Sequence, residues 1–272
     1  MISIKAYGES SSSSLNDNDS KELSTLSIDN LLAENILITE SLINASMPEL
    51  KQSELGKVLT RYYNQCLGGA DHWATIKSIK ISADLDSTTG IYQYESINKK
   101  PNSYKIAISY DGVTNIVAFD GNNKWQKQIS DEGVFFPEII PQMDRMVNET
   151  ELSSYLLFPL LKEKAFQYKG TVREFNTVCH RISLFAEQDY LIDYFIDVES
   201  YFIVSIKLTD TLREFSPVLI RYSDYQKVDG LYFAHKIETF VDGKWVSTLK
   251  VNSINTNVGA LDWMFRLLDK VR

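Results

Sequence analysis

Four Asp-Gly pairs divide the sequence into runs of strand-forming residues. The pairs are Asp111-Gly112, Asp120-Gly121, Asp229-Gly230 and Asp242-Gly243. Glycine reaches the positive φ angles of tight turns without a steric clash, and Asp-Gly is one of the preferred two-residue hairpin loops. Because hairpins join antiparallel neighbours, the four pairs predict one large antiparallel meander.

The runs between these turns alternate between apolar and polar residues. In 78–85 and 104–110 every second residue is apolar, which is typical of a sheet with one dry and one wetter face. Similar patterns predict further strands at 91–97, 114–119, 123–129, 166–174, 177–186, 189–198, 201–209, 215–227, 231–241 and 244–255. No strand–helix–strand alternation occurs, so a parallel sheet is disfavoured. We expect about twelve strands.

Three or four helices accompany these strands. A loose helical stripe covers 27–45, and a second one covers Glu49–Leu67 and stops at Gly68-Gly69. A short helical turn follows at Ala70–Ile76. The ending, Leu261–Val271, fits a helix or an extended segment.

Residues 133–165 interrupt the meander. Pro137, Pro141 and Pro159 break regular structure there, and Glu149–Glu163 has the pattern of a helix. A non-strand insertion between two strand series can fold back over the sheet. We therefore expect 133–165 to form a lid or a plug.

Composition limits the functions open to this chain. The net charge of −8 and a pI near 5 lack the basic patch of a nucleic-acid-binding protein. No apolar run reaches the ~18 residues of a membrane-spanning helix, and residues 1–8 carry no secretory signal. Residues 8–20 are rich in Ser, Asn and Asp. We expect a mobile tail over 1–25 and one domain over 26–272.

The chain shows no pattern that points to catalysis or metal binding. The three histidines, His72, His180 and His235, have no ligand spacing, and no phosphate loop, nucleophile elbow or zinc motif occurs. Cys66 and Cys179 are interpreted as small buried hydrophobic residues, with a disulfide or a reactive thiol as the alternative. Asp193 and Asp197 are placed on the solvated outer face of a strand. We therefore predict no catalytic residue, no metal and no cofactor.

Aromatic and aliphatic residues supply the candidate binding site. Residues on strand faces could line a concave apolar cavity, because burying one methylene of a ligand chain contributes ~0.8 kcal/mol without any chemical motif. A void-free core would have the same sequence pattern, so a hollow and a packed interior both stay open. The predicted cavity-lining residues are Tyr92, Tyr94, Tyr104, Ile106, Ile108, Tyr110, Phe202, Val204, Tyr222 and Trp245.

Several segments, in order, resemble the LolA/LolB-like superfamily, and most of all its uncharacterised members. The resemblance covers roughly residues 50–265. Its segments are Tyr62–Leu85 with the Gly-Gly stop and Ile-Lys-Ser-Ile, Ala118–Gln126 with Asp-Gly and Trp, Phe158–Leu160, Gly170, Ile196-Asp197, and Tyr225–Phe233. These motifs are turns and anchors, so they indicate a fold more strongly than a function. The chain departs from the usual pattern at Ala234-His235, where a proline is common, in the additional helix at 27–45, and in the missing export signal.

The resemblance implies an α+β fold: an unclosed, strongly curved antiparallel half-barrel of about 10–12 strands, with helices in its concave face as a lid. It further implies a non-enzymatic periplasmic or outer-membrane-associated protein that binds a lipid, a lipoprotein acyl chain or another hydrophobic ligand. Arg181 or Arg221 near the mouth would tune affinity. The alternatives are a protein-interaction or stress-sensor module with a filled cavity, a cytoplasmic location because no signal segment is seen, and, remotely, a hydrolase.

Overall fold

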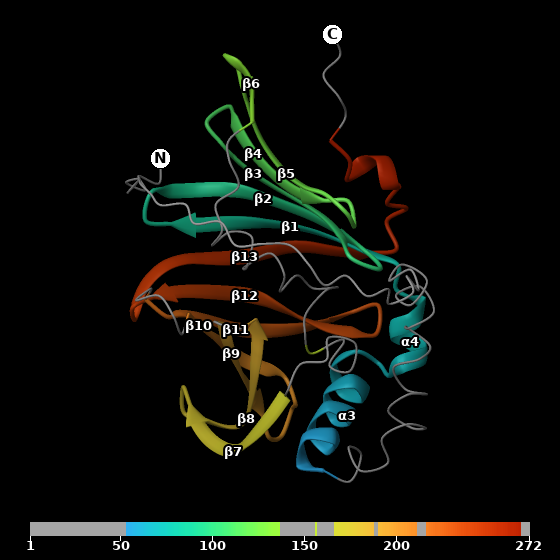
Figure 1. Ribbon diagram of the computed structural model, residues 1–272, viewed down its shortest axis with the longest axis vertical. Coiled ribbons are helices and arrows are strands. Elements are labelled where there is room, and N and C mark those ends of the chain that lie inside the picture. Colours follow the sequence, from blue (N-terminus) through green and yellow to red (C-terminus); the bar gives the residue numbers. More distant parts are fainter. Residues whose placement is uncertain (1–52, 137–155, 157–165, 188–189, 211–215, 268–272) are drawn as a thin grey trace, which may run out of the picture.

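The computed structural model describes residues 53–136, 156, 166–187, 190–210 and 216–267. Within these residues the chain forms one 13-stranded antiparallel sheet, with its two α-helices on one side of the sheet (Figure 1). The strand order is β6-β5-β4-β3-β2-β1-β13-β12-β11-β10-β9-β8-β7. The edge strands β6 and β7 are not paired with each other, so the sheet is open.

The elements have the following bounds. The helices are α3 (Glu54–Cys66), α4 (Ala70–Thr75) and the 3₁₀ helix η2 (Asp262–Met264). The strands are β1 (Ser78–Ser87), β2 (Gly90–Lys99), β3 (Ser103–Tyr110), β4 (Val113–Phe119), β5 (Lys124–Ser130), β6 (Gly133–Phe135), β7 (Phe166–Glu174), β8 (Thr177–Glu187), β9 (Tyr190–Asp197), β10 (Ile203–Asp210), β11 (Val218–Val228), β12 (Leu231–Val241) and β13 (Lys244–Thr256).

The α+β architecture with a curved, unclosed antiparallel sheet is confirmed, and the strand count needs one correction. The thirteenth strand is β6, which lies at the start of the segment expected to be a non-strand insertion. A two-residue turn at Asp131-Glu132 brings it back onto β5, where Ser130 pairs with Gly133. Its three residues are too few for an alternation to be visible in the sequence.

Three of the four Asp-Gly pairs form the expected hairpin turn. Both residues have positive φ angles in Asp111-Gly112, Asp229-Gly230 and Asp242-Gly243, as the two-residue loop with both central residues at positive φ requires. Asp120-Gly121 lies in a longer turn. There the Asp120 carboxylate accepts hydrogen bonds from the backbone amides of Asn122 and Asn123 at 2.9 and 2.7 Å.

Helix α3 ends at the predicted Gly-Gly stop, but it begins at Glu54 and not at Glu49. The Ser53 hydroxyl accepts a hydrogen bond from the Gly56 amide at 3.0 Å and caps the helix N-terminus. At the other end, the Gly69 amide donates to the Tyr63 carbonyl at 3.1 Å, and Gly68 and Gly69 adopt positive φ angles. The buried side chains of α3 lie along one face, which packs against the sheet.

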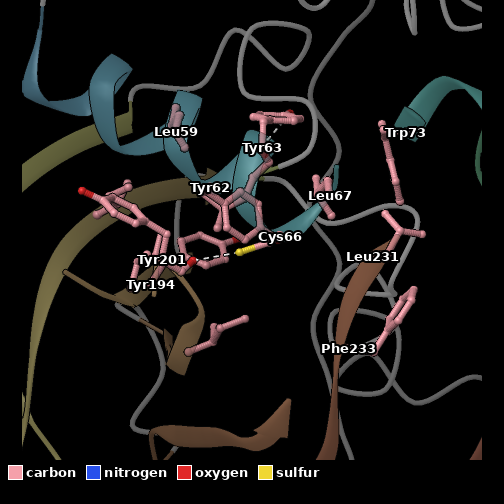
Figure 2. Close-up of a cluster of buried hydrophobic side chains, with 14 of the residues drawn as sticks. Leu59, Tyr62, Tyr63, Cys66, Leu67, Trp73, Tyr194, Tyr201, Leu231 and Phe233 are labelled. Atoms are coloured by element: carbon pink, nitrogen blue, oxygen red, sulfur yellow. Dashed lines mark hydrogen bonds between the residues drawn. The ribbon is translucent and has the colours of Figure 1, made fainter. Parts of the chain in front are cut away.

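The main core lies between α3, α4 and strands β1 and β8–β13; we call the face of the sheet that lines it the concave face. Figure 2 shows Tyr62 and Cys66 of α3 beside Tyr194 and Tyr201, whereas Tyr63 points to the other side of the helix. Farther along the same layer it shows Trp73 of α4 near Leu231 and Phe233 of β12. This part of the concave face is therefore packed with side chains.

Two polar side chains of α3 form hydrogen bonds within this core, whereas His180 Nε2, beside Tyr201, is buried without a partner. The Cys66 thiol donates to the Tyr201 carbonyl at 3.1 Å, and the Tyr63 hydroxyl donates to the Leu156 carbonyl at 3.1 Å. Leu156 is fully buried and belongs to the expected helix Glu149–Glu163. The other residues of that helix, and the expected tail and helix at 1–25 and 27–45, lie outside the described residues.

The C-terminal segment covers the opposite, convex face of the sheet. The segment Leu261–Val271 was predicted to be helical or extended, and its described part contains only the short helix η2. Phe265 is buried, and its carbonyl accepts a hydrogen bond from the Trp125 indole at 2.7 Å. Trp125 packs there with Ile116 and Ala118 in a small cluster.

Candidate functional site

The concave face continues beyond the main core onto strands β2–β5, which we call the wing. Strand pairing places its side chains in rows that run across the strands. One row contains Ser96, Ile106, Val117 and Gln126, and the next contains Asn98, Tyr104, Phe119 and Lys124. Because Ser96 also pairs with Ile81 of β1, which is part of the main core, these rows lie on the concave face.

The centre of the wing is apolar. Tyr104, Ile106, Val117 and Phe119 form a cluster that is separate from the main core. The rings of Tyr104 and Phe119 lie 5.9 Å apart. Among the described residues, the main core reaches the wing only at Tyr94. Tyr104 and Val117 are 3% and 7% exposed, so the wing contains a buried apolar layer against which α3 does not pack.

Polar atoms without partners border this apolar centre. Ser96 is 2% exposed and Asn98 is 3% exposed, yet Ser96 Oγ and Asn98 Oδ1 have no hydrogen-bond partner. Gln126 Oε1, on the other side of the apolar centre, is also buried without a partner. By contrast, on the same face the Gln128 side-chain amide donates a hydrogen bond to Asn115 Oδ1 at 3.1 Å. Unsatisfied buried groups are unusual enough in native proteins to call for an explanation.

A buried lysine lies where the wing meets α4. Lys100 follows β2 directly, and its ammonium donates a hydrogen bond to the Trp73 carbonyl and lies 3.9 Å from the centre of the Trp73 ring. Burial, with a smaller contribution from the nearby positive charge of Lys77, lowers the pKa of Lys100 to about 7.

A second concavity lies near the β7–β8 turn. It is a groove of about 240 Å³ between that turn, the β9–β10 connection and β11. Phe175 forms one wall, with the Arg221 guanidinium 4.8 Å from its ring centre. Phe202 forms another and stacks on Tyr225 at 4.3 Å. The groove is smaller than a typical small-molecule pocket.

The ten predicted cavity-lining residues fall into three groups. Six share the concave face of the wing, where the Tyr92 and Tyr110 rings lie 4.9 Å apart: Tyr92, Tyr94, Tyr104, Ile106, Ile108 and Tyr110. Three line the groove: Phe202, Val204 and Tyr222. Trp245 is 39% exposed near the β12–β13 turn and donates to the Thr248 hydroxyl at 2.9 Å. Their contact with a ligand stays a prediction.

Arg181 and Arg221, the expected affinity-tuning residues, are separate from the wing. Arg221 lines the groove, and Arg181 forms a paired contact with Asp193 at 3.1 and 2.8 Å. The placement of Asp193 on a solvated exterior is wrong, because Asp193 is 3% exposed. Arg181 and the Ser183 hydroxyl satisfy its carboxylate, which allows it to be buried. Asp197 accepts hydrogen bonds from the amides of the β9–β10 turn.

The histidines and cysteines hold structural positions. His72 contacts the Asp229 carbonyl, His180 contacts the Tyr168 hydroxyl, and His235 contacts the Phe233 carbonyl. Cys66 and Cys179 are free and buried, as expected, and burial raises their thiol pKa values to about 12 and about 11. Among the described residues, no group of three or more His, Cys, Asp and Glu is placed to hold a metal ion. Neither described α-helix is long and apolar enough to span a membrane.

Four residues of the site were not predicted from the sequence: Ser96, Asn98, Gln126 and Lys100. A signal was present for the first two, because strand alternation puts Ser96 and Asn98 on the face that carries Tyr92 and Tyr94. Two polar residues that continue an apolar face are a departure from the pattern of a dry face.

No family model matches the sequence, and no curated protein matches it. Solved structures share its fold. A DUF1329 family protein from Desulfovibrio piger aligns with a TM-score of 0.54 and 10% identity over 77% of this chain and 96% of that protein. A LolA superfamily protein from Nitrosomonas europaea aligns with a TM-score of 0.54 and 10% identity over 78% of this chain and 96% of that protein. An outer membrane lipoprotein-sorting protein domain from Vibrio parahaemolyticus aligns with a TM-score of 0.51 and 10% identity over 77% of this chain and 95% of that domain. The chain has a LolA-like fold, as the resemblance implied.

Proposed function

We propose that this protein binds the hydrophobic chain of a lipid or of a lipoprotein on the concave face of its wing, in the cell envelope. The observation that carries the proposal is the division of the concave face. Over β8–β13 the face is packed by α3 and α4, whereas the wing carries a separate apolar cluster of Tyr104, Ile106, Val117 and Phe119.

The chemistry of the wing suits an aliphatic chain. Ile106 and Val117 are adjacent in one row, and Tyr104 and Phe119 are adjacent in the next, so the surface is continuous across two strands. Each methylene that leaves water on such a surface contributes about 0.8 kcal/mol, so shape and apolar area are sufficient for binding. The envelope location is supported by the LolA superfamily and lipoprotein-sorting proteins that share the fold. No catalytic step is needed.

Lipid extraction and a matched pair of variants test this function. Mass spectrometry of protein purified from bacterial membranes should detect a bound lipid, and a fluorescent palmitoyl probe should bind the delipidated protein. Ile106→Thr should weaken probe binding on the order of tenfold, because it removes apolar contact and adds a hydroxyl. Ile91→Thr, on the exposed face of β2, is the control and should leave binding unchanged.

Two results would contradict the proposal. One is the absence of both copurified lipid and probe binding in the wild-type protein. The other is an equal effect of Ile106→Thr and Ile91→Thr on probe affinity, because only the first residue lies on the concave face.

A protein-interaction role is the second candidate. It is favoured by the groove beside β11, whose aromatic walls and Arg221 suit a protein segment better than an aliphatic chain. Capture of one specific envelope protein by the wild type, lost in Arg221→Ala, would support it; capture unaffected by Arg221→Ala would count against this groove.

A further inference from the structure

We propose that Ser96 and Asn98 form a polar subsite on the wing, which binds the hydrogen-bond donors of a lipid head group while the lipid chain lies on the apolar centre. The inference rests on the proposed function and names the class of ligand. That class is a lipid whose chain is joined to a group bearing O–H or N–H donors, as in a glyceride or an acylated peptide terminus.

Ser96 and Asn98 each carry a buried polar atom that lacks a hydrogen-bond partner. Ser96 and Asn98 are 2% and 3% exposed, and Ser96 Oγ and Asn98 Oδ1 have no hydrogen-bond partner. A buried polar atom in this condition destabilises the fold, because it has lost its water without replacement. Such a cost is typical of a functional site, where binding restores the missing hydrogen bond.

The position of the two residues is the second argument. They are two apart on β2, so their side chains lie about 7 Å from each other on the same face. Each is adjacent to one row of the apolar centre, because Ser96 pairs with Ile106 and Asn98 pairs with Tyr104. A chain that lies on Ile106 and Val117 would therefore bring its head group onto the subsite.

The chemistry of the atoms selects the ligand. An amide oxygen only accepts hydrogen bonds, whereas a serine hydroxyl both accepts and donates. With the Asn98 amide as oriented in the structure, its oxygen requires a donor. Gln126 Oε1, at the far side of the apolar centre, has the same requirement. A simple ester head group offers acceptors only and leaves these oxygens unsatisfied.

Three palmitoyl compounds provide the test. 1-Monopalmitoylglycerol and an N-palmitoylated peptide amide carry donors, whereas methyl palmitate carries none. Displacement of bound anilinonaphthalene sulfonate gives the affinity of each. The wild type should prefer the better donor-bearing compound over methyl palmitate by on the order of tenfold, and which of the two binds more tightly distinguishes a free glyceride from an acylated peptide as the source.

Two variants test whether Ser96 and Asn98 cause the preference for donor-bearing compounds. Ser96→Ala and Asn98→Leu should each reduce it by about threefold or more, and affinity for methyl palmitate should change little. Gln93→Leu, on the exposed face of the same strand, is the matched control and should keep the full preference. Because Ser96→Ala removes an unsatisfied hydroxyl, its urea midpoint without lipid should equal or exceed that of the wild type.

The outcomes separate this inference from the proposed function. If all three compounds bind with equal affinity, the wing binds lipid but the polar subsite is wrong, and an ordered water is then the partner of Ser96 and Asn98. A lower urea midpoint for Ser96→Ala also overturns the subsite, because the hydroxyl must then have a partner in the folded protein. If none of the compounds binds, the proposed function and the subsite both fail.

Discussion

Replacing Lys100 with methionine should change how the stability of the protein depends on pH. Burial lowers the pKa of Lys100 to about 7 in the folded protein, whereas a lysine in the unfolded chain has a pKa near 10.4. Between these values the unfolded chain binds a proton that the folded chain does not. The free energy of unfolding therefore rises with pH across this window. The stability that Lys100 gains at high pH is lost as the pH falls toward 7.

The two pKa values set the size of this effect. From pH 7.5 to pH 9.5 the Lys100 contribution grows by at most about 2.5 kcal/mol. Cys66 and Cys179 act in the opposite direction, because burial raises their thiol pKa values and the unfolded thiols ionise in this range. Their effect is the same in the wild type and in Lys100→Met, so the difference between the two proteins isolates Lys100.

Urea denaturation at pH 7.5, 8.5 and 9.5, followed by tryptophan fluorescence, measures this difference. The stability of the wild type relative to Lys100→Met should increase by roughly 2 kcal/mol across the series. Lys250→Met, which changes a lysine whose side chain is 61% exposed, should follow the wild-type profile. A constant difference between the wild type and Lys100→Met at all three pH values would refute the neutral, desolvated state of Lys100 at high pH.

Two substitutions test contacts made by α3 and α4. Tyr63→Phe should lower the free energy of unfolding by about 1–3 kcal/mol in urea, because the buried Leu156 carbonyl loses the tyrosine hydroxyl as a donor; an effect below 0.5 kcal/mol would contradict this. Gly230→Ala should destabilise the protein by at least ~1 kcal/mol more than Gly243→Ala in the same assay. Both glycines follow Asp in hairpin turns and have positive φ angles. A Cβ at Gly230 would lie 2.5 Å from His72 Nε2, whereas a Cβ at Gly243 would meet no atom within 4 Å. Equal destabilisation by the two substitutions would show that the His72 side chain moves aside at no cost.

Local patterns in the sequence predicted twelve of the thirteen strands and part of the candidate site. Hairpin turns at Asp-Gly and the Gly-Gly stop depend on a few neighbouring residues, so they could be located without the fold, whereas the Ser53 cap was not predicted. Strand alternation likewise put Tyr92, Tyr94, Ile106 and Ile108 on one face each of β2 and β3, and the structure brings these faces together. The resemblance supplied the half-barrel.

Only the tertiary structure decided which residues meet across the sheet. β1 pairs with β13, joining Ile79 to Thr256, and no periodicity within either strand specifies so distant a partner. The same long-range pairing determines that α3 fills the concave face over β8–β13 and does not pack against the wing. It also determines that Ser96 and Asn98 are buried beside an apolar cluster, and that Lys100 contacts Trp73 in a dry environment. Alternation divides a strand into two faces, but burial and partners depend on what the rest of the chain places against each face.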